Sequence, residues 1–249
     1  MGARSIQHRR RTPRGFSLLE LLVVLGVTWL LIALLMPAFA RLRESARRVA
    51  CASNMHQIAI ALESFARENR NRFPNSYFSG DESRRSRPQE MMILNRGTWG
   101  DTWDGIGRLY PRQYLSDPGA YYCPSHTGEH PMERYQRMWN RHSRTQIFGN
   151  YHYRGMLNPS NAMPDPIDRH DRDRIRTENP TGVSILADGL RTKSDFNHRT
   201  GSNLLMDDLS VEWMVDERQR LYLMLPDRVS ENWPRGPIWA QLDRASREK

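Results

Sequence analysis

The chain has 249 residues, which is enough for one domain with a sizeable core and one additional element. It is basic, with 37 Lys and Arg residues against 28 Asp and Glu, but residues 1–15 hold five arginines and no acid. Subtracting those five charges from the formal +9 leaves +4. So small a charge on so long a chain does not indicate nucleic-acid binding, and no nucleic-acid partner is predicted.

The apolar residues are concentrated near the N-terminus, in residues 16–40, where Glu20 is the single charge. This run reaches the roughly 20 residues that a helix needs to cross a bilayer. The basic leader, residues 1–15, favours a cytoplasmic N-terminus. Four arginines within residues 41–48 weaken that argument, so the predicted orientation rests partly on the motif at the start of the run.

Glu20 needs a physical explanation, because a carboxylate at the centre of a membrane helix costs about 2.5–3.5 kcal/mol on insertion scales. Its place near the end of the run lowers that cost. If the chain is cut between Gly15 and Phe16, the new amine of Phe16 lies four residues before Glu20. Amine and carboxylate can then neutralise each other within one chain or between neighbours. Between neighbours, the pair would set the axial register of packed helices.

The segment GFSLLE, residues 15–20, after a short basic leader and before an apolar helix, resembles the cleavage and methylation site of type IV pilins and pseudopilins. Pro37, later in the helix, matches as well. The resemblance implies that a prepilin peptidase cuts after Gly15 and methylates Phe16, and that Glu20 supports assembly. It implies a structural subunit of a type II secretion or type IV pilus-like machine, and not an enzyme.

The same resemblance implies the partners and the location of the chain. The partners would be the prepilin peptidase, sister pilin or pseudopilin subunits, an inner-membrane assembly platform and membrane lipid. The protein would cross the bacterial inner membrane once, with its N-terminus in the cytoplasm and its C-terminal domain in the periplasm. After assembly it would belong to a pilus or pseudopilus.

Three alternatives remain open. A secretory signal peptide would use the small-x-small pattern of residues 38–40 and start the mature chain at Arg41, although the apolar run exceeds the usual 7–15 residues. A membrane-tethered binding module would carry the pilin-type leader without polymerising, and a secreted hydrolase is the third. The binding surface of such a module would be an aromatic group that is more typical of core anchors, namely Trp99, Trp103, Tyr110 and Tyr114.

An amphipathic helix is predicted over residues 41–72, continuing the membrane helix into the globular domain of residues 73–249. Asn69, Asn71 and Pro74 mark its expected end. Its apolar residues mostly recur at steps of three and four, as in a helix packed on a domain. They are Leu42, Ala46, Val49, Ala50, Met55, Ile58, Ala59, Leu62 and Phe65.

The globular domain contains short β-prone runs between turn residues, which predict strands. Strands that follow one long helix indicate an α+β fold, here a pilin-like antiparallel sheet packed on the helix. The predicted strands are residues 145–153, 182–187, 202–206, 211–215 and 221–225.

Three further elements resemble those of a large subgroup of bacterial pseudopilin-like proteins. They are the Cys and Asn-x-x-Gln-Ile of residues 50–58, the Cys-Pro-Ser of residues 123–125, and His198 followed after nine residues by Asp208. The subgroup continues with Asp-Gly, but here Leu209 replaces the Gly. Because Leu disfavours a positive φ, we expect a wider or shifted hairpin than a tight Asp-Gly turn.

The two cysteines, Cys51 and Cys123, can form one disulfide in an oxidising compartment or stay separate thiols. Cys123, His126 and His130 have spacings that suit a metal, but no fourth ligand is evident, and a polar loop explains them as well.

Two other groups of residues invite a chemical interpretation. His198 with Asp208 could act as an acid–base pair, although a hydrogen bond that fixes the hairpin is the favoured interpretation. The sequence predicts no catalytic residue and no cofactor, and it leaves open a calcium-binding loop. The acids of that loop are Asp165, Asp168, Asp171 and Asp173.

Overall fold

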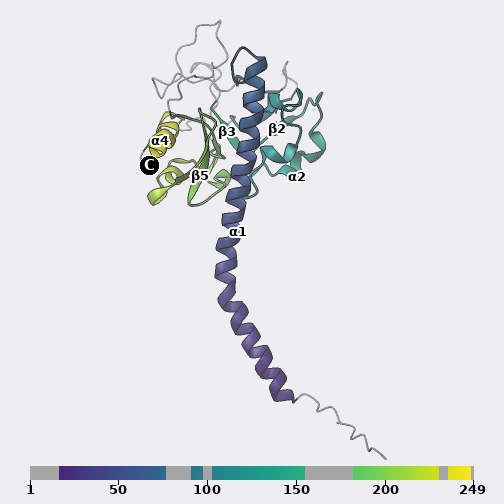
Figure 1. Cartoon of the computed structure of the whole chain (residues 1–249), viewed down its shortest axis with the longest axis vertical. Coiled ribbons are helices and arrows are strands. Elements are labelled where there is room, and N and C mark those ends of the chain that lie inside the picture. The colour runs from purple at the N-terminus through teal and green to yellow at the C-terminus, as the bar shows by residue number, and fades with distance from the viewer. Residues whose placement is uncertain (1–16, 77–90, 98–102, 155–181, 230–234, 248–249) are drawn as a thin grey trace, which may run out of the picture. The chain divides into compact units, whose positions relative to one another are not determined.

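A computed structural model describes residues 17–76, 91–97, 103–154, 182–229 and 235–247 (Figure 1). The chain forms two compact units, residues 1–44 and 45–249, which are described separately. The helices are α1 (Leu18–Glu68), α2 (Met132–Tyr135), α3 (Arg220–Met224) and α4 (Arg235–Arg247), with 3-10 helices η3 (Gly105–Leu109), η4 (Pro118–Tyr121), η5 (Gln136–Met138), η6 (Lys193–Asp195) and η7 (Glu217–Gln219). The strands are β1 (Ile93–Arg96), β2 (Gln146–Phe148), β3 (Tyr151–Tyr153), β4 (Ser184–Asp188), β5 (Gly201–Met206) and β6 (Val211–Val215).

The first unit contains the apolar part of α1, which is long and apolar enough to cross a membrane by length and composition. Its most apolar stretch has a mean hydropathy of 2.6, and none of that stretch is buried. At the start of the helix, the Ser17 amide donates to Glu20 Oε2 at 3.0 Å. This contact corresponds to half of a capping box, in which a glutamate in the first turn accepts from the residue before the helix. The predicted sites Gly15 and Phe16 lie outside the described residues.

The C-terminal part of α1 carries the core of the second unit. Its buried stripe starts at Cys51 and repeats every three or four residues, as expected for one helix face. Leu42 and Val49, which we predicted to belong to this face, are both 64% exposed. Ahead of Cys51 the domain contacts the helix at Arg48, through Trp213 and Asn203, and it leaves Leu42 and Val49 uncovered. The helix ends at Glu68, close to the predicted end, and Asn71 follows with a positive φ. The stripe consists of Cys51, Met55, Ile58, Leu62 and Phe65.

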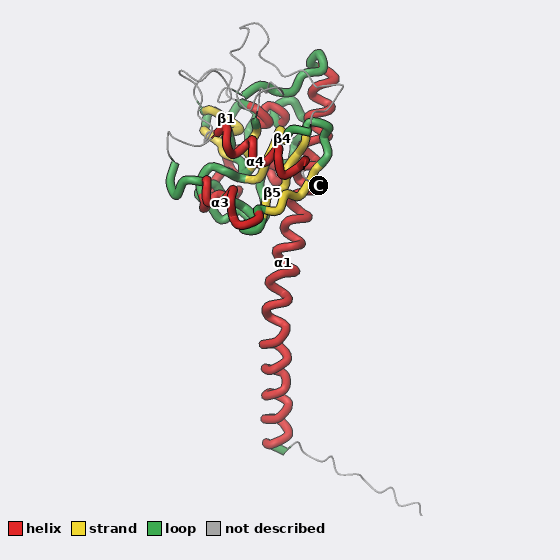
Figure 2. The backbone as a smooth tube through the Cα atoms, turned by 90° about the vertical axis from the view of Figure 1, so that its left-hand side faces the viewer, coloured by secondary structure: helices red, strands yellow, loops and turns green. Residues whose placement is uncertain are grey.

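An antiparallel sheet of four strands, in the order β3-β4-β5-β6, packs against this part of α1. Figures 1 and 2 both show α4 on the opposite face of the sheet. There Arg154 forms an ion pair with Asp243 of α4 at 2.8 Å, and Asp243 also accepts from the Ser184 amide of β4. A second, two-stranded antiparallel sheet joins β1 and β2. The predicted α+β fold with an antiparallel sheet on a long helix is confirmed.

The structure corrects two of the predicted strands and adds elements that the sequence did not predict. The run 145–153 forms two strands that belong to different sheets. Residues 221–225 are not a strand, because the Asp216 carboxylate accepts from the amides of Leu221 and Tyr222 at 2.8 and 3.0 Å and thereby starts α3. Strand β1 and helix α4 were not predicted.

The aromatic residues expected to form the domain core or a binding surface belong to the core where they are described. Trp103 is 4% exposed, and its ring lies 5.1 Å from that of Tyr110 and 5.7 Å from that of Trp139. Tyr114 is partly buried and contacts Phe65 of α1 edge to face. Trp99 lies outside the described residues.

The hairpin between β5 and β6 has a three-residue loop, Asp207 to Leu209, closed by the Met206 amide donating to the Ser210 carbonyl at 2.9 Å. The loop is thus wider than a two-residue turn, as expected. Leu209 nevertheless adopts a φ of +70°, a conformation that favours glycine. Three-residue loops of this kind place a left-handed residue at their last position.

Leu209→Gly is therefore expected to be more stable than Leu209→Ala by about 1 kcal/mol, because both remove the half-buried side chain and only alanine retains the backbone strain. Thermal unfolding of the two variants, followed by tryptophan fluorescence, measures the difference. Equal stability would show that the loop relaxes to a negative φ when the leucine is removed.

Candidate functional site

Four side chains with metal-binding or proton-transferring groups meet in the core of the second unit. Cys51 comes from α1, Cys123 follows η4, Asp188 ends β4 and His198 precedes β5. Their exposed fractions are 0, 4, 0 and 1%, so the group is sealed from solvent. One sulfur, nitrogen or carboxylate oxygen of each lies within 4.8 Å of those of the other three. This group is called the Cys₂AspHis cluster below.

Short contacts connect neighbouring members of the cluster. The Cys51 thiol donates to Asp188 Oδ1 at 2.9 Å. Cys123 Sγ lies 3.5 Å from His198 Nε2, which in turn lies 3.6 Å from Asp188 Oδ2. Each member therefore touches at least one other through the atom that carries its chemistry.

Further hydrogen bonds hold Asp188 in place. The Asn203 amide donates to Asp188 Oδ2 at 2.6 Å, and Asn197 Nδ2 lies 3.4 Å from Oδ1. Asn197 Oδ1 in turn accepts a hydrogen bond from His126 Nδ1 at 2.7 Å. The Tyr151 hydroxyl lies 3.5 Å from Cys51 Sγ. Polar neighbours thus surround the cluster and fix its carboxylate.

Burial dominates the acid–base properties of the cluster. It raises the pKa of the Asp188 carboxyl, although the nearby His198 and the donated hydrogen bonds oppose this. Burial also raises the pKa of the Cys51 thiol well above its usual range, and the Asp188 carboxylate adds to the effect. For Cys123, burial acts in the same direction, but the neighbouring Cys51 and His198 side chains lower its pKa overall. The two cysteines are therefore chemically unequal.

The sequence singled out Cys51, Cys123 and His198, but it did not predict that they lie together. His198 lies against Asp188, whereas Asp208 is exposed and accepts from the Ser210 amide, so the predicted pairing of His198 with Asp208 is wrong. Asp208 is the exposed residue of the hairpin loop after β5, so it points away from the core. The Cys51–Cys123 disulfide stays a prediction. Both cysteines are free thiols in this structure, but their sulfurs lie within 4.8 Å of each other.

The predicted zinc ligands Cys123, His126 and His130 do not form one group in the structure. Cys123 faces Cys51 and His198, His126 is bonded to Asn197, and His130 points elsewhere. The acids proposed for calcium binding, within residues 165–173, lie outside the described residues. Asp188 was missed because no local pattern marks it, and only the sheet brings it to the cysteines.

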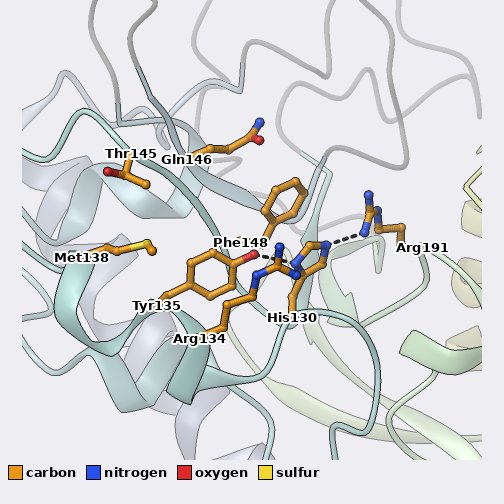
Figure 3. Close-up of a pocket in the computed structure, with 8 residues that line it drawn as sticks. All are labelled: His130, Arg134, Tyr135, Met138, Thr145, Gln146, Phe148 and Arg191. Atoms are coloured by element: carbon orange, nitrogen blue, oxygen red, sulfur yellow. Dashed lines mark hydrogen bonds between the residues drawn. The ribbon is translucent and has the colours of Figure 1, made fainter.

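An open pocket of about 540 Å³ lies at a different place in the domain (Figure 3). Within it, His130 stacks on Phe148 with the ring centres 4.0 Å apart and shares a hydrogen bond with the Tyr135 hydroxyl at 2.5 Å. Arg191 donates to the other ring nitrogen of His130 and pairs with Glu129. The lining residues are His130, Arg134, Tyr135, Met138, Thr145, Gln146, Phe148 and Arg191.

Burial, followed by the charges of Arg191 and Arg134, lowers the pKa of His130 to about 3. The native state therefore holds a neutral imidazole, while the unfolded chain takes up a proton near its ordinary pKa of about 6.5. The stability that depends on neutral His130 is present above pH 6.5 and is lost as the pH falls toward 3.

Wild-type protein is accordingly expected to lose roughly 1–3 kcal/mol more stability between pH 7 and pH 4 than His130→Gln. Thermal unfolding at the two pH values measures this difference, in which the contributions of other groups cancel. His142→Gln, at an exposed histidine outside the pocket, serves as the matched control for the substitution itself. A His130→Gln slope equal to wild type would mean that the histidine is charged in the folded domain.

The sequence of the chain matches one described protein family. The family model described as "Protein of unknown function (DUF1559)" matches residues 40–193, more than half of the chain. The chain belongs to the DUF1559 family. No curated protein and no solved structure matches it. The part that matches DUF1559 contains Cys51, Cys123 and Asp188 and ends shortly before His198.

Proposed function

We propose that this DUF1559 protein is a structural subunit of a pilin-like or pseudopilin assembly of the type IV pilus or type II secretion kind, and not an enzyme. The observation that carries the proposal is the apolar part of α1, whose large side chains from Leu18 to Phe39 are exposed. Such a surface requires lipid or apolar helices around it. The GFSLLE segment at its start supports a pilin-type origin over an ordinary anchor.

In this proposal the chain passes through two environments. The precursor inserts in the inner membrane, with its basic leader in the cytoplasm and residues 45–249 in the periplasm. A prepilin peptidase then cuts after Gly15 and methylates Phe16, and an assembly platform moves the subunit from lipid into a bundle of sister helices. The exposed apolar side chains contact lipid before assembly and neighbouring subunits after it.

Glu20 provides the test, because the structure offers two roles for its carboxylate. It accepts a hydrogen bond from Ser17, which glutamine can replace, and after cleavage it would neutralise the amine of Phe16, which glutamine cannot do. We expect both Glu20→Ala and Glu20→Gln to be processed normally. Both should reduce self-crosslinked multimers in membranes at least about fivefold, equivalent to roughly 1 kcal/mol at an interface.

The two variants separate the roles of Glu20. If Glu20→Gln assembles like wild type and Glu20→Ala does not, then the carboxylate caps the helix and its charge is not needed. If both assemble like wild type, Glu20 has no role in assembly. Crosslinking of wild type to a single foreign protein, without self-contacts, would instead support the membrane-tethered binding module.

A further inference from the structure

We propose that the Cys₂AspHis cluster is a zinc site, with Cys51, Cys123, Asp188 and His198 as its four ligands. The proposal concerns the globular domain and does not depend on whether the chain assembles into a filament. It is distinct from the Cys123, His126 and His130 set that the sequence suggested.

Two of the distances between donor atoms agree with tetrahedral coordination. Zn–S bonds of about 2.3 Å and Zn–N or Zn–O bonds of about 2.0–2.1 Å place two sulfurs about 3.8 Å apart, a sulfur and a nitrogen about 3.5 Å apart, and a nitrogen and an oxygen about 3.3 Å apart. The observed Cys123 Sγ–His198 Nε2 and His198 Nε2–Asp188 Oδ2 distances are 3.5 and 3.6 Å. Cys51 Sγ lies 2.9 Å from the other carboxylate oxygen, Oδ1, about half an ångström less than the sulfur–oxygen edge. Because a tetrahedral site takes one oxygen of Asp188, the carboxylate and the Cys51 thiolate would have to shift relative to each other on binding.

The donor types select the metal. Two thiolates with one imidazole suit zinc, whereas calcium and magnesium require mostly oxygen ligands. Zinc would replace the thiol proton that Cys51 now donates to Asp188, and both thiol protons would leave to solvent on binding. The resulting group carries one net negative charge, from two thiolates and one carboxylate against Zn²⁺.

Neighbouring donors are placed to stabilise that negative charge. The Asn203 amide and Asn197 Nδ2 lie at the two oxygens of Asp188, and the Tyr151 hydroxyl lies beside Cys51 Sγ. Such outer-shell hydrogen bonds orient metal-bound carboxylates and thiolates. The polar surroundings of this buried cluster thus suit four bound ligands.

A site closed by four protein ligands is structural rather than catalytic, because it leaves no position for substrate or water. Its ligands come from α1, the segment after η4, the end of β4 and the segment before β5. Zinc would therefore fasten the long helix to the sheet that packs on it. A disulfide is the competing use of the two sulfurs, but it would remove the Cys51 proton from Asp188 and employ neither Asp188 nor His198.

The first test is metal analysis of the full-length chain, purified from membranes in mild detergent without chelators. We expect about one zinc per chain, and removal of zinc by a chelator should lower the melting temperature by about 10 °C or more. Cobalt exchanged into the protein should show thiolate charge-transfer absorption and tetrahedral visible bands. The chain has only two cysteines, so that absorption identifies Cys51 or Cys123 without any variant.

Variants then assign the remaining ligands. Cys123→Ser and His198→Gln should each reduce bound zinc at least about tenfold. His142→Gln, which removes an exposed histidine outside the cluster, should keep it. A wild-type mass lower by two hydrogen atoms would show a disulfide and overturn the proposal. Protein with two free thiols and no zinc would overturn it as well, as would zinc that survives both ligand substitutions.

Discussion

Replacing Gly15 by aspartate is expected to leave the chain at full length in the membrane, with its leader of residues 1–15 still attached. The proposed peptidase must approach the bond between Gly15 and Phe16 closely, and only glycine presents a backbone without a side chain. Aspartate adds both bulk and a negative charge at that bond. The expected loss of processing is essentially complete, which makes it the largest functional effect among these predictions.

The measurement is the intact mass of the protein, produced together with a prepilin peptidase and recovered from membranes. Thr12→Asp is the matched control, since it introduces the same charge in the same leader three residues before the cleavage site. It should be processed like wild type. Normal cleavage of Gly15→Asp would contradict the assignment of this bond, and loss of cleavage in both variants would indicate an effect of leader charge alone.

Replacing Gly107 by alanine is expected to destabilise the globular domain by about 3–5 kcal/mol. A Cβ at this position of η3 would lie 2.0 Å from the Leu94 carbonyl oxygen and 2.7 Å from the Leu94 carbonyl carbon and Cα. These are backbone atoms of β1, and the same carbonyl accepts from the Asp104 amide at 2.9 Å. The clash can be relieved only by moving β1 away from η3, and β1 is the partner of β2.

For a domain of this size, the expected loss corresponds to a melting temperature about 10 °C lower. Gly119→Ala is the matched control, because its Cβ would meet only the Asp117 side chain, at 3.2 Å. A flexible side chain can move aside, so that variant should lose less than about 1 kcal/mol. Equal melting temperatures for the two variants would show that η3 and β1 are not packed together as described.

Local patterns predicted the elements that local interactions determine. The three- and four-residue spacing from Met55 to Phe65 predicted a helix face that is buried, and β6 has the predicted bounds of residues 211–215. The pattern failed at Leu42 and Val49, because periodicity shows which side of a helix is apolar but not where a domain begins to cover it.

Other elements depend on contacts that the sequence pattern does not display. Residues 221–225 are apolar enough for a strand, but the Asp216 carboxylate caps α3. Helix α4 was hidden among charged residues, although Ile238, Trp239 and Leu242 share a helical spacing and are buried. In each case a few specific contacts determine the secondary structure, and the average hydrophobicity of the segment does not predict it.

The candidate site shows the same limit more sharply. Cys51, Cys123 and His198 drew attention individually, since cysteine and histidine carry metal and redox chemistry. Asp188 did not, because it ends a buried strand and has no neighbouring ligand in the sequence. The four residues of the cluster are far apart in the sequence and come together through the packing of α1 on the sheet. No spacing rule along the sequence predicts such a contact.

The central claim is that the chain is a processed, pilin-like membrane subunit, and its mature N-terminus tests this most directly. Intact mass and N-terminal sequencing of the protein purified from membranes give the answer in one preparation. We expect the chain to begin with N-methylated Phe16. A chain that begins at Arg41 would have lost its apolar helix to a signal peptidase, and that result would contradict the assembly role proposed for Glu20 and for α1.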